Sequence, residues 1–222
     1  MRRFEFVVDR RHAHAVNEVV AGRRRLRLAA VVAVLLGAGA TAYLVWLSRA
    51  WSYPLALACA LGAATAMWVA LWAPRRAGIA RLYAEGELVP AVVSRIHPRG
   101  AVLLALVNVA RRDTGESRYA LVTKNVRGLP AHRVAEGERV PAIAVRGDST
   151  APVTAERWLP VDVMPIAWGT ADIAVIECAR AVVTEIEWRL LTDNLALADR
   201  VQRSATRRLL LDPGQLPEGL GA

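Results

Sequence analysis

The residues that could do chemistry in this sequence are its four histidines, its two cysteines and two pairs of glutamates. His12 and His14 are two positions apart, so on a helix they would not share a face. No cysteine or carboxylate pattern beside them completes a metal site. His97 and His132 fall in predicted loops, and solvated side chains are the simpler interpretation of all four histidines.

The glutamates belong to an internal echo, in which residues 84–91 (AEGELVPA) reappear as residues 135–142 (AEGERVPA). Paired carboxylates could act as a general acid and base, but here they flank a turn glycine with no histidine or cysteine nearby. We interpret each copy as a helix end that leads through glycine into an edge strand, where proline is tolerated.

No phosphate-binding loop, dinucleotide fingerprint, nucleophile elbow or HExxH motif occurs in the sequence. Cys59 lies inside an apolar run and Cys178 far from it, so a disulfide between them is not expected. The sequence therefore predicts a non-enzymatic protein with no cofactor and no metal.

Two apolar runs precede the repeated segments 84–91 and 135–142. Residues 28–47 and 54–73 each hold 20 residues without a charge, about the length that a helix needs to cross a bilayer. Residues 48–53 are long enough only for a turn, so residues 26–73 are predicted to form a transmembrane helical hairpin. A cleaved signal peptide has a shorter apolar core, which argues against that alternative.

Arginine sets the expected orientation. The chain of 222 residues carries a net charge of +9, and arginines concentrate before the first run and after the second, whereas the turn holds only Arg49. Positive flanks stay on the cytoplasmic side, so we expect a multi-pass protein of the cell (inner) membrane with both termini in the cytoplasm. The flanking arginines are also the expected contacts to anionic lipid: Arg23, Arg24, Arg25, Arg75 and Arg76.

Small residues recur at every fourth position of both runs and predict a helix-packing face. The set comprises Ala33, Gly37, Ala58, Gly62 and Ala66. The simpler interpretation is that the two faces pack together within the hairpin. Homo-oligomerisation through the same face stays open as the alternative.

The remaining segments divide the chain further. Residues 1–25 are read as a cytoplasmic arm, with a short strand at Phe4 to Val8 and a helix that Asp9 caps and that bends near Gly22. Residues 74–86 are a basic connector, and residues 212–222 a disordered tail.

Residues 87–165 change to short Val- and Leu-rich runs between turn signals. Five strands are expected, at 87–96, 101–109, 118–124, 139–145 and 158–163. This spacing suggests a small cytoplasmic β-barrel-like domain of the OB or SH3-like type, and an open sheet stays open. Residues 166–211 form a C-terminal helical segment: a helical period from Thr170 to about Ala198 predicts a long helix that packs on that domain or on the connector, and Asp199 to Leu211 could continue it as a basic amphipathic helix. The fold class is therefore membrane-anchored α+β.

Several segments resemble an actinobacterial family of predicted membrane proteins that is catalogued as a domain of unknown function. They are Val8-Asp9 with Asn17-Glu18, residues 129–133, residues 137–142 and the PIAWGT sequence at residues 165–170. The resemblance implies a membrane protein but no activity and no catalytic residues.

The functional hypothesis is a membrane-anchored interaction or scaffold module with a protein partner. An exposed Trp168 beside Pro165 could anchor that partner, although a tryptophan that fixes the junction between barrel and helix is the alternative. Nucleic-acid or anionic-ligand binding through an OB-like face is a second hypothesis, based on Arg95, Arg99, Arg111, Arg112 and Arg118. Few aromatic side chains are available there for base stacking, which disfavours nucleic acid.

Overall fold

The computed structural model describes residues 2–72, 78–109, 118–146 and 161–212, together with residues 214, 216, 217 and 220. The chain forms two compact units. One, which we call the sheet unit, comprises Met1–Val16 and Ala80–Ala222. The other, the hairpin unit, comprises Asn17–Ile79.

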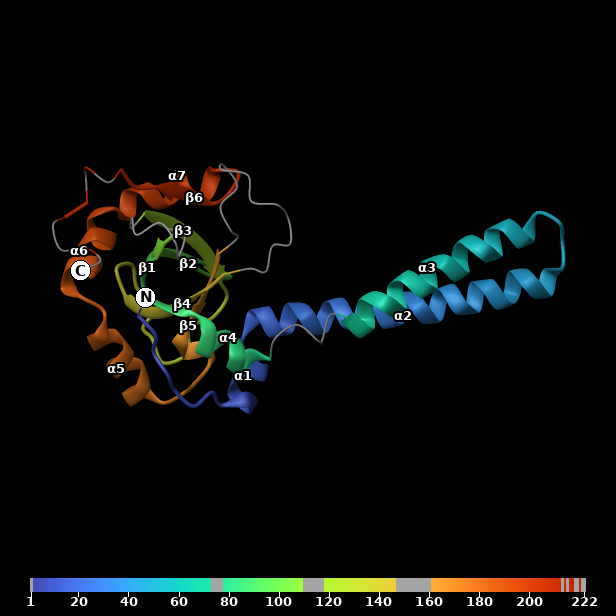
Figure 1. The fold of residues 1–222 in the computed structure, drawn as a ribbon, viewed down its shortest axis with the longest axis horizontal. Helices are drawn as coiled ribbons and strands as arrows, with labels where there is room; N and C mark the ends of the chain where they lie inside the picture. The colour runs from blue at the N-terminus through green and yellow to red at the C-terminus, as the bar shows by residue number, and fades with distance from the viewer. Residues whose placement is uncertain are drawn as a thin grey trace. The chain divides into compact units, whose positions relative to one another are not determined.

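The hairpin unit consists of two long antiparallel helices, α2 (Glu18–Leu47) and α3 (Ser52–Trp72) (Figure 1). Between them, Ser48 closes α2 in the left-handed conformation, and the Ser52 hydroxyl donates to the Arg49 carbonyl over 2.8 Å. Both helices are long and apolar enough to cross a membrane, and only 11% of either apolar window is buried. They are therefore unlike the core helices of a soluble protein, whose apolar faces are covered.

The two helices pack through a seam of small residues. Ala30 and Leu44 of α2 and Ser52 and Ala56 of α3 are its most buried members. Gly37 lies so close to α3 that an added Cβ would be 2.9 Å from the Ala63 methyl carbon. Buried and half-buried positions of α2 include Ala30, Val34, Gly37, Thr41 and Leu44. They are alternately four and three residues apart, the spacing of left-handed helix pairs.

The predicted packing face is correct only in part. Gly37 lies in the seam and Ala66 is half-buried, but Ala33, Ala58 and Gly62 are exposed, and a Cβ on Gly62 would meet nothing within 4 Å. The reason is geometric: a strict four-residue spacing drifts around a helix of 3.6 residues per turn, so one straight stripe cannot follow a seam along its whole length.

The sheet unit is built on a six-stranded antiparallel sheet with the order β5-β4-β1-β2-β3-β6. Its strands are β1 (Glu87–His97), β2 (Gly100–Asn108), β3 (Tyr119–Val126), β4 (Arg139–Arg146), β5 (Val161–Pro165) and β6 (Arg208–Leu210). The first five match the predicted strands to within a few residues. β6 was not expected, because residues 208–210 were assigned to a helix.

The sheet is curled into a half-barrel. β3 and β5 are separated by three strands in the sheet order, yet they approach each other. The Lys124 ammonium group of β3 lies 2.5 Å from the Asp162 carboxylate of β5. The prediction of a barrel-like domain is therefore supported at the level of a curled sheet, without assignment to the OB or SH3-like type.

The two copies of the internal echo pair with each other. β1 and β4 run antiparallel with Pro90 directly opposite Pro141 and Glu87 opposite Ala144. The expectation of edge strands was wrong, since β1 has a neighbour on both sides; β2, however, pairs with it only from Ala91 onward. Pro90 thus lies in the part of β1 that pairs with β4 but not with β2. A proline, which lacks the N–H group, is tolerated where a strand is paired on one side only.

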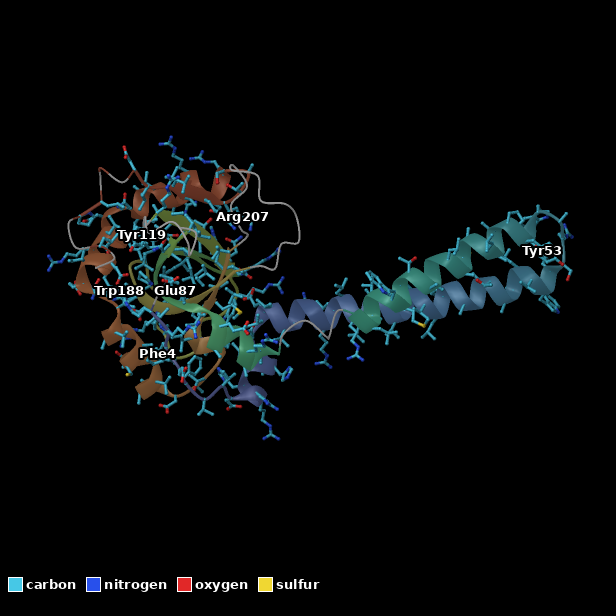
Figure 2. The ribbon with its side chains drawn as sticks, viewed as in Figure 1. Phe4, Tyr53, Glu87, Tyr119, Trp188 and Arg207 are labelled. Atoms are coloured by element: carbon cyan, nitrogen blue, oxygen red, sulfur yellow. The ribbon has the colours of Figure 1, made fainter. Side chains whose placement is uncertain are left out.

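Three helices cover one face of the sheet: α5 (Ile173–Val182), α6 (Glu185–Asp193) and α7 (Ala198–Arg203) (Figure 1). They contact β4, β1 with β2, and β3, respectively. The fully buried Trp188 lies on α6 at this interface (Figure 2). β2 is a central strand of this sheet, and both of its faces are covered. It is therefore buried at seven consecutive positions.

The single long C-terminal helix that we expected is wrong. Thr184 and Glu187 form a capping box that starts α6, and Val183 before it is extended. A capping box satisfies backbone N–H groups only at the start of a helix, so it breaks the period there. A 3-10 turn, Leu195–Leu197, separates α6 from α7, and most of the predicted disordered tail lies outside the described residues.

The N-terminal arm is extended along Phe4 to Val8 but forms no strand, contrary to the prediction. Asp9 does cap the next helix, α1 (Arg10–Val16), by accepting from the Arg11 and His12 amides. The chain breaks at Asn17 rather than near Gly22, because the Asn17 side chain accepts from the Val19 and Val20 amides and starts α2. On the other side of the hairpin, part of the predicted connector forms α4 (Ile79–Glu85).

A matched pair of substitutions tests the hairpin seam. Gly37→Leu should destabilise the packing of α2 on α3 by about 1–3 kcal/mol, since the added side chain would overlap the Ala63 methyl group. Gly62→Leu adds the same side chain where space is open and should leave the helix pair unchanged. The measurement is SDS-induced unfolding of the full chain; equal effects of the two substitutions would contradict the seam.

Candidate functional site

Polar groups converge at a buried turn after β5 and at a groove between α5 and α6. The turn comprises Pro165–Thr170 and contains the 3-10 helix η2 (Ile166–Trp168). We call it the 165–170 turn. Its residues Ile166, Ala167 and Trp168 are fully buried.

The 165–170 turn receives hydrogen bonds from the segment that precedes the hairpin. The Asp9 amide donates to the Gly169 carbonyl over 2.9 Å, and a His12 ring nitrogen lies 2.9 Å from the Ala167 carbonyl. The expectation of solvated histidines is therefore wrong for His12, because its ring is held against this turn.

The segment that follows the hairpin reaches the same turn. The Tyr83 hydroxyl of α4 donates to the Pro165 carbonyl over 2.9 Å, and this contact is buried. The Phe6 ring packs edge-on against the Tyr83 ring at 5.3 Å. A Cβ on Gly169 would lie 3.0 Å from both of these rings, so glycine lets the arm and α4 close over the turn.

Trp168 has a structural role in this arrangement. Its side chain is 0% exposed, and its indole N–H donates to the Gly128 carbonyl over 2.9 Å. The prediction of an exposed Trp168 that anchors a partner beside Pro165 is therefore wrong. The alternative, a tryptophan that fixes the junction between the sheet and the helices, agrees with these contacts.

The α5–α6 groove has a volume of about 440 Å³. Charged side chains make up half of its wall, which is formed by Arg139, Glu177, Arg180, Ala181, Val183, Thr184, Glu185 and Trp188. Val182 and Ile186, 41% and 39% exposed, lie on the two helices that form it. The two helices thus present exposed apolar side chains as well as the charged residues of the groove.

The charges in the groove are arranged as connected ion pairs. Arg139 holds Glu185 with two hydrogen bonds of 2.8 and 2.6 Å, and its guanidinium lies 5.5 Å from the centre of the Trp188 ring. Arg180 bonds both Glu177 and Glu138. The hydrogen bond from Arg139 lowers the pKa of Glu185 below its ordinary value.

Of the five arginines predicted to contact anionic lipid, the structure describes the side chains of two. Arg24 and Arg25 are exposed on α2, as lipid contact would require; Arg75 and Arg76, and the side chain of Arg23, fall outside what the structure describes. Among the described residues no group of three or more histidine, cysteine, aspartate or glutamate side chains could hold a metal ion.

Sequence reasoning missed the groove. The T-x-x-E signal at Thr184 to Glu187 was present and could have located the break between α5 and α6. The pairing of Arg139 with Glu185, and that of Arg2 with Glu187 at 2.9 Å, join residues 46 and 185 positions apart. No local pattern indicates such pairs.

These contacts define a class: an α+β domain of a curled sheet and three covering helices, in one chain with an exposed apolar hairpin. Residues 75–199 match the family described as protein of unknown function (DUF3239). The match spans more than half of the chain, so the chain belongs to this family. The predicted resemblance is thereby confirmed.

A solved structure agrees with this assignment. It is the crystal structure of a "putative membrane protein from Corynebacterium diphtheriae", which is 34% identical to this chain with a TM-score of 0.52. The similarity covers 56% of this chain and 100% of the other. None of the curated proteins matches the chain.

The buried Tyr83 hydroxyl provides a test of the 165–170 turn. Tyr83→Phe leaves the Pro165 carbonyl without this donor and should lower the free energy of unfolding of the sheet unit by about 1–3 kcal/mol. Tyr43→Phe removes the same hydroxyl from an exposed position and serves as the control. Chemical denaturation of the full chain measures both; a Tyr83→Phe variant as stable as the control would contradict the assignment.

Titration of Glu185 tests the groove. Its pKa should lie below the ordinary value of 4.5, and Arg139→Gln should raise it. Because the pKa is lowered in the folded state, the pair stabilises the fold above the pKa of the unfolded chain, and this stabilisation is lost as the pH falls through the folded pKa. Carbon-13 NMR of the carboxylate measures the shift; an unchanged pKa in the variant would show that Arg139 does not cause it.

Proposed function

We propose that this protein is a membrane-anchored, non-enzymatic interaction module: α2 and α3 span the cell membrane, and the sheet unit binds a protein partner. The observation that carries the proposal is the hairpin itself, two helices whose apolar side chains are exposed along their length. Exposed side chains include Leu35 at 67% and Leu61 at 62%, and a bilayer is the environment that such a surface requires.

Both segments that connect to the hairpin are bonded within the sheet unit, so a spanning hairpin would tether this unit to the membrane at two points of the chain. α1 bonds the 165–170 turn before the hairpin, and α4 bonds it afterwards. The distribution of arginine supports a multi-pass arrangement with both termini in the cytoplasm.

The α5–α6 groove is the partner contact that this proposal favours. It offers partly exposed arginine side chains, and the exposed Val182 and Ile186 lie on the same two helices. Protein interfaces commonly combine arginine with apolar side chains. The hydroxyl of Thr184, which lies in the groove, donates to Glu187 and is occupied by the capping box. The contacts of the groove therefore suit binding better than covalent chemistry.

Nucleic-acid binding receives less support. Arg95 is paired with Asp199, and Arg111 and Arg112 lie outside the described residues. The rings of the described sheet unit are buried, as in Tyr119 and Trp188, or half-buried, as in Phe4 and Phe6. Stacking of unpaired bases requires exposed rings.

Two experiments test this proposal. The full chain should stay in the membrane pellet after extraction with alkaline carbonate and enter solution only with detergent; release by carbonate would contradict a spanning hairpin. A photo-crosslinking amino acid at Ala181, an exposed residue that lines the groove, should capture a defined partner in native membranes. The same group at exposed Arg133, which does not line the groove, is the control. Identical products at both positions, or none at Ala181, would contradict the assignment of the groove.

A further inference from the structure

A second surface of the sheet unit is rich in exposed arginine. Arg99 lies in the turn between β1 and β2, Arg127 directly follows β3, and Arg200 and Arg203 lie on α7; all four side chains are exposed. Ile96, 45% exposed, lies at the end of β1 beside them. We call these five residues the basic surface.

Contacts in the fold bring these residues together from three segments. Gly100 is packed so closely on the backbone of Arg127 that a Cβ there would be 2.7 Å from the Arg127 Cα. Asp199, the neighbour of Arg200, bonds Arg95 at 2.5 Å. Gln202, the neighbour of Arg203, bonds Asn125 of β3 at 3.5 Å. The basic surface is therefore one region of the sheet unit.

The position of this region relative to the hairpin connections follows from the 165–170 turn. That turn holds α1 through His12 and α4 through Tyr83, and its Trp168 donates to the carbonyl of Gly128, the residue after Arg127. Arg127 of the basic surface is thus the neighbour of a residue that bonds the 165–170 turn. Because the chain runs directly from both connections into the hairpin, a spanning hairpin would keep the sheet unit within reach of the membrane surface.

We infer that the basic surface docks on anionic phospholipid headgroups of the membrane in which the hairpin is anchored. Arginines near such a surface are attracted by the phosphates, and an exposed isoleucine among them can enter the boundary between headgroups and acyl chains. A duplex nucleic acid would use the arginines but offers nothing apolar to Ile96. This inference rests on the proposed anchoring.

The test uses the full chain in lipid nanodiscs made of phosphatidylcholine alone or with phosphatidylglycerol as about a third of the lipid, a composition that makes the surface anionic. Hydrogen exchange of peptides from α7 and the β1–β2 turn should slow in the anionic discs and recover at high salt. Because one arginine near the surface contributes about fivefold to binding, Arg200→Ser should remove much of this protection. Arg189→Ser makes the same change of charge on α6 and should not.

Exchange that is independent of the lipid, or an equal loss in both variants, would overturn the inference. A fluorescent DNA duplex added to the phosphatidylcholine discs provides the competing result: duplex binding that Arg200→Ser weakens, without any lipid effect, would assign the basic surface to nucleic acid instead. Failure of the anchoring proposal is distinguishable, since a chain that does not span would not incorporate into either disc.

Discussion

The carbonyl groups of the 165–170 turn accept hydrogen bonds from both segments that connect the hairpin to the sheet unit. A 3-10 turn leaves several carbonyls without partners inside the helix, and here Tyr83 and the Asp9 amide satisfy two of them, while the His12 ring lies within bonding distance of a third. Since unsatisfied buried carbonyls are costly, the arm and α4 must both be in place for the turn to be stable. The fold of the sheet unit therefore depends on residues from both sides of a separate apolar unit.

This dependence explains the composition of the PIAWGT segment. The indole of Trp168 fills the interior and fixes the loop after β3 through Gly128. Gly169 leaves room for two aromatic rings. Thr170 accepts from the Asp172 amide and so prepares the start of α5. One short segment thus joins the sheet, the covering helices and both hairpin connections.

Local patterns in the sequence predicted much of this fold. Charge-free runs located α2 and α3, alternating apolar residues located five strands, and Asp9 located the start of α1. The breaks at Asn17 and Thr184 were missed because a continuing apolar period outweighed capping signals that were present in the sequence. The echo of residues 84–91 and 135–142 was recognised, but its reason, the pairing of β1 with β4, depends on tertiary register.

The candidate sites were less predictable, because they depend on pairs of residues far apart in the chain. A tryptophan between proline and glycine suits an exposed anchor as well as a buried junction, and only burial distinguishes the two for Trp168. The α5–α6 groove needs Arg139 of β4 and Glu185 of α6 to meet, and the basic surface needs three segments. Composition alone indicates that arginine is abundant, without indicating where it gathers.

The most direct test of whether the N-terminal arm is part of the sheet unit is native-state hydrogen exchange of the Asp9 amide in the full chain. If the arm is an integral part of the sheet unit, this amide should exchange only with the global unfolding of β1 to β3, with a similar free energy. Exchange of Asp9 at the rate of a freely accessible terminus, while the sheet stays protected, would show that the arm is a loose tether and would contradict the central claim.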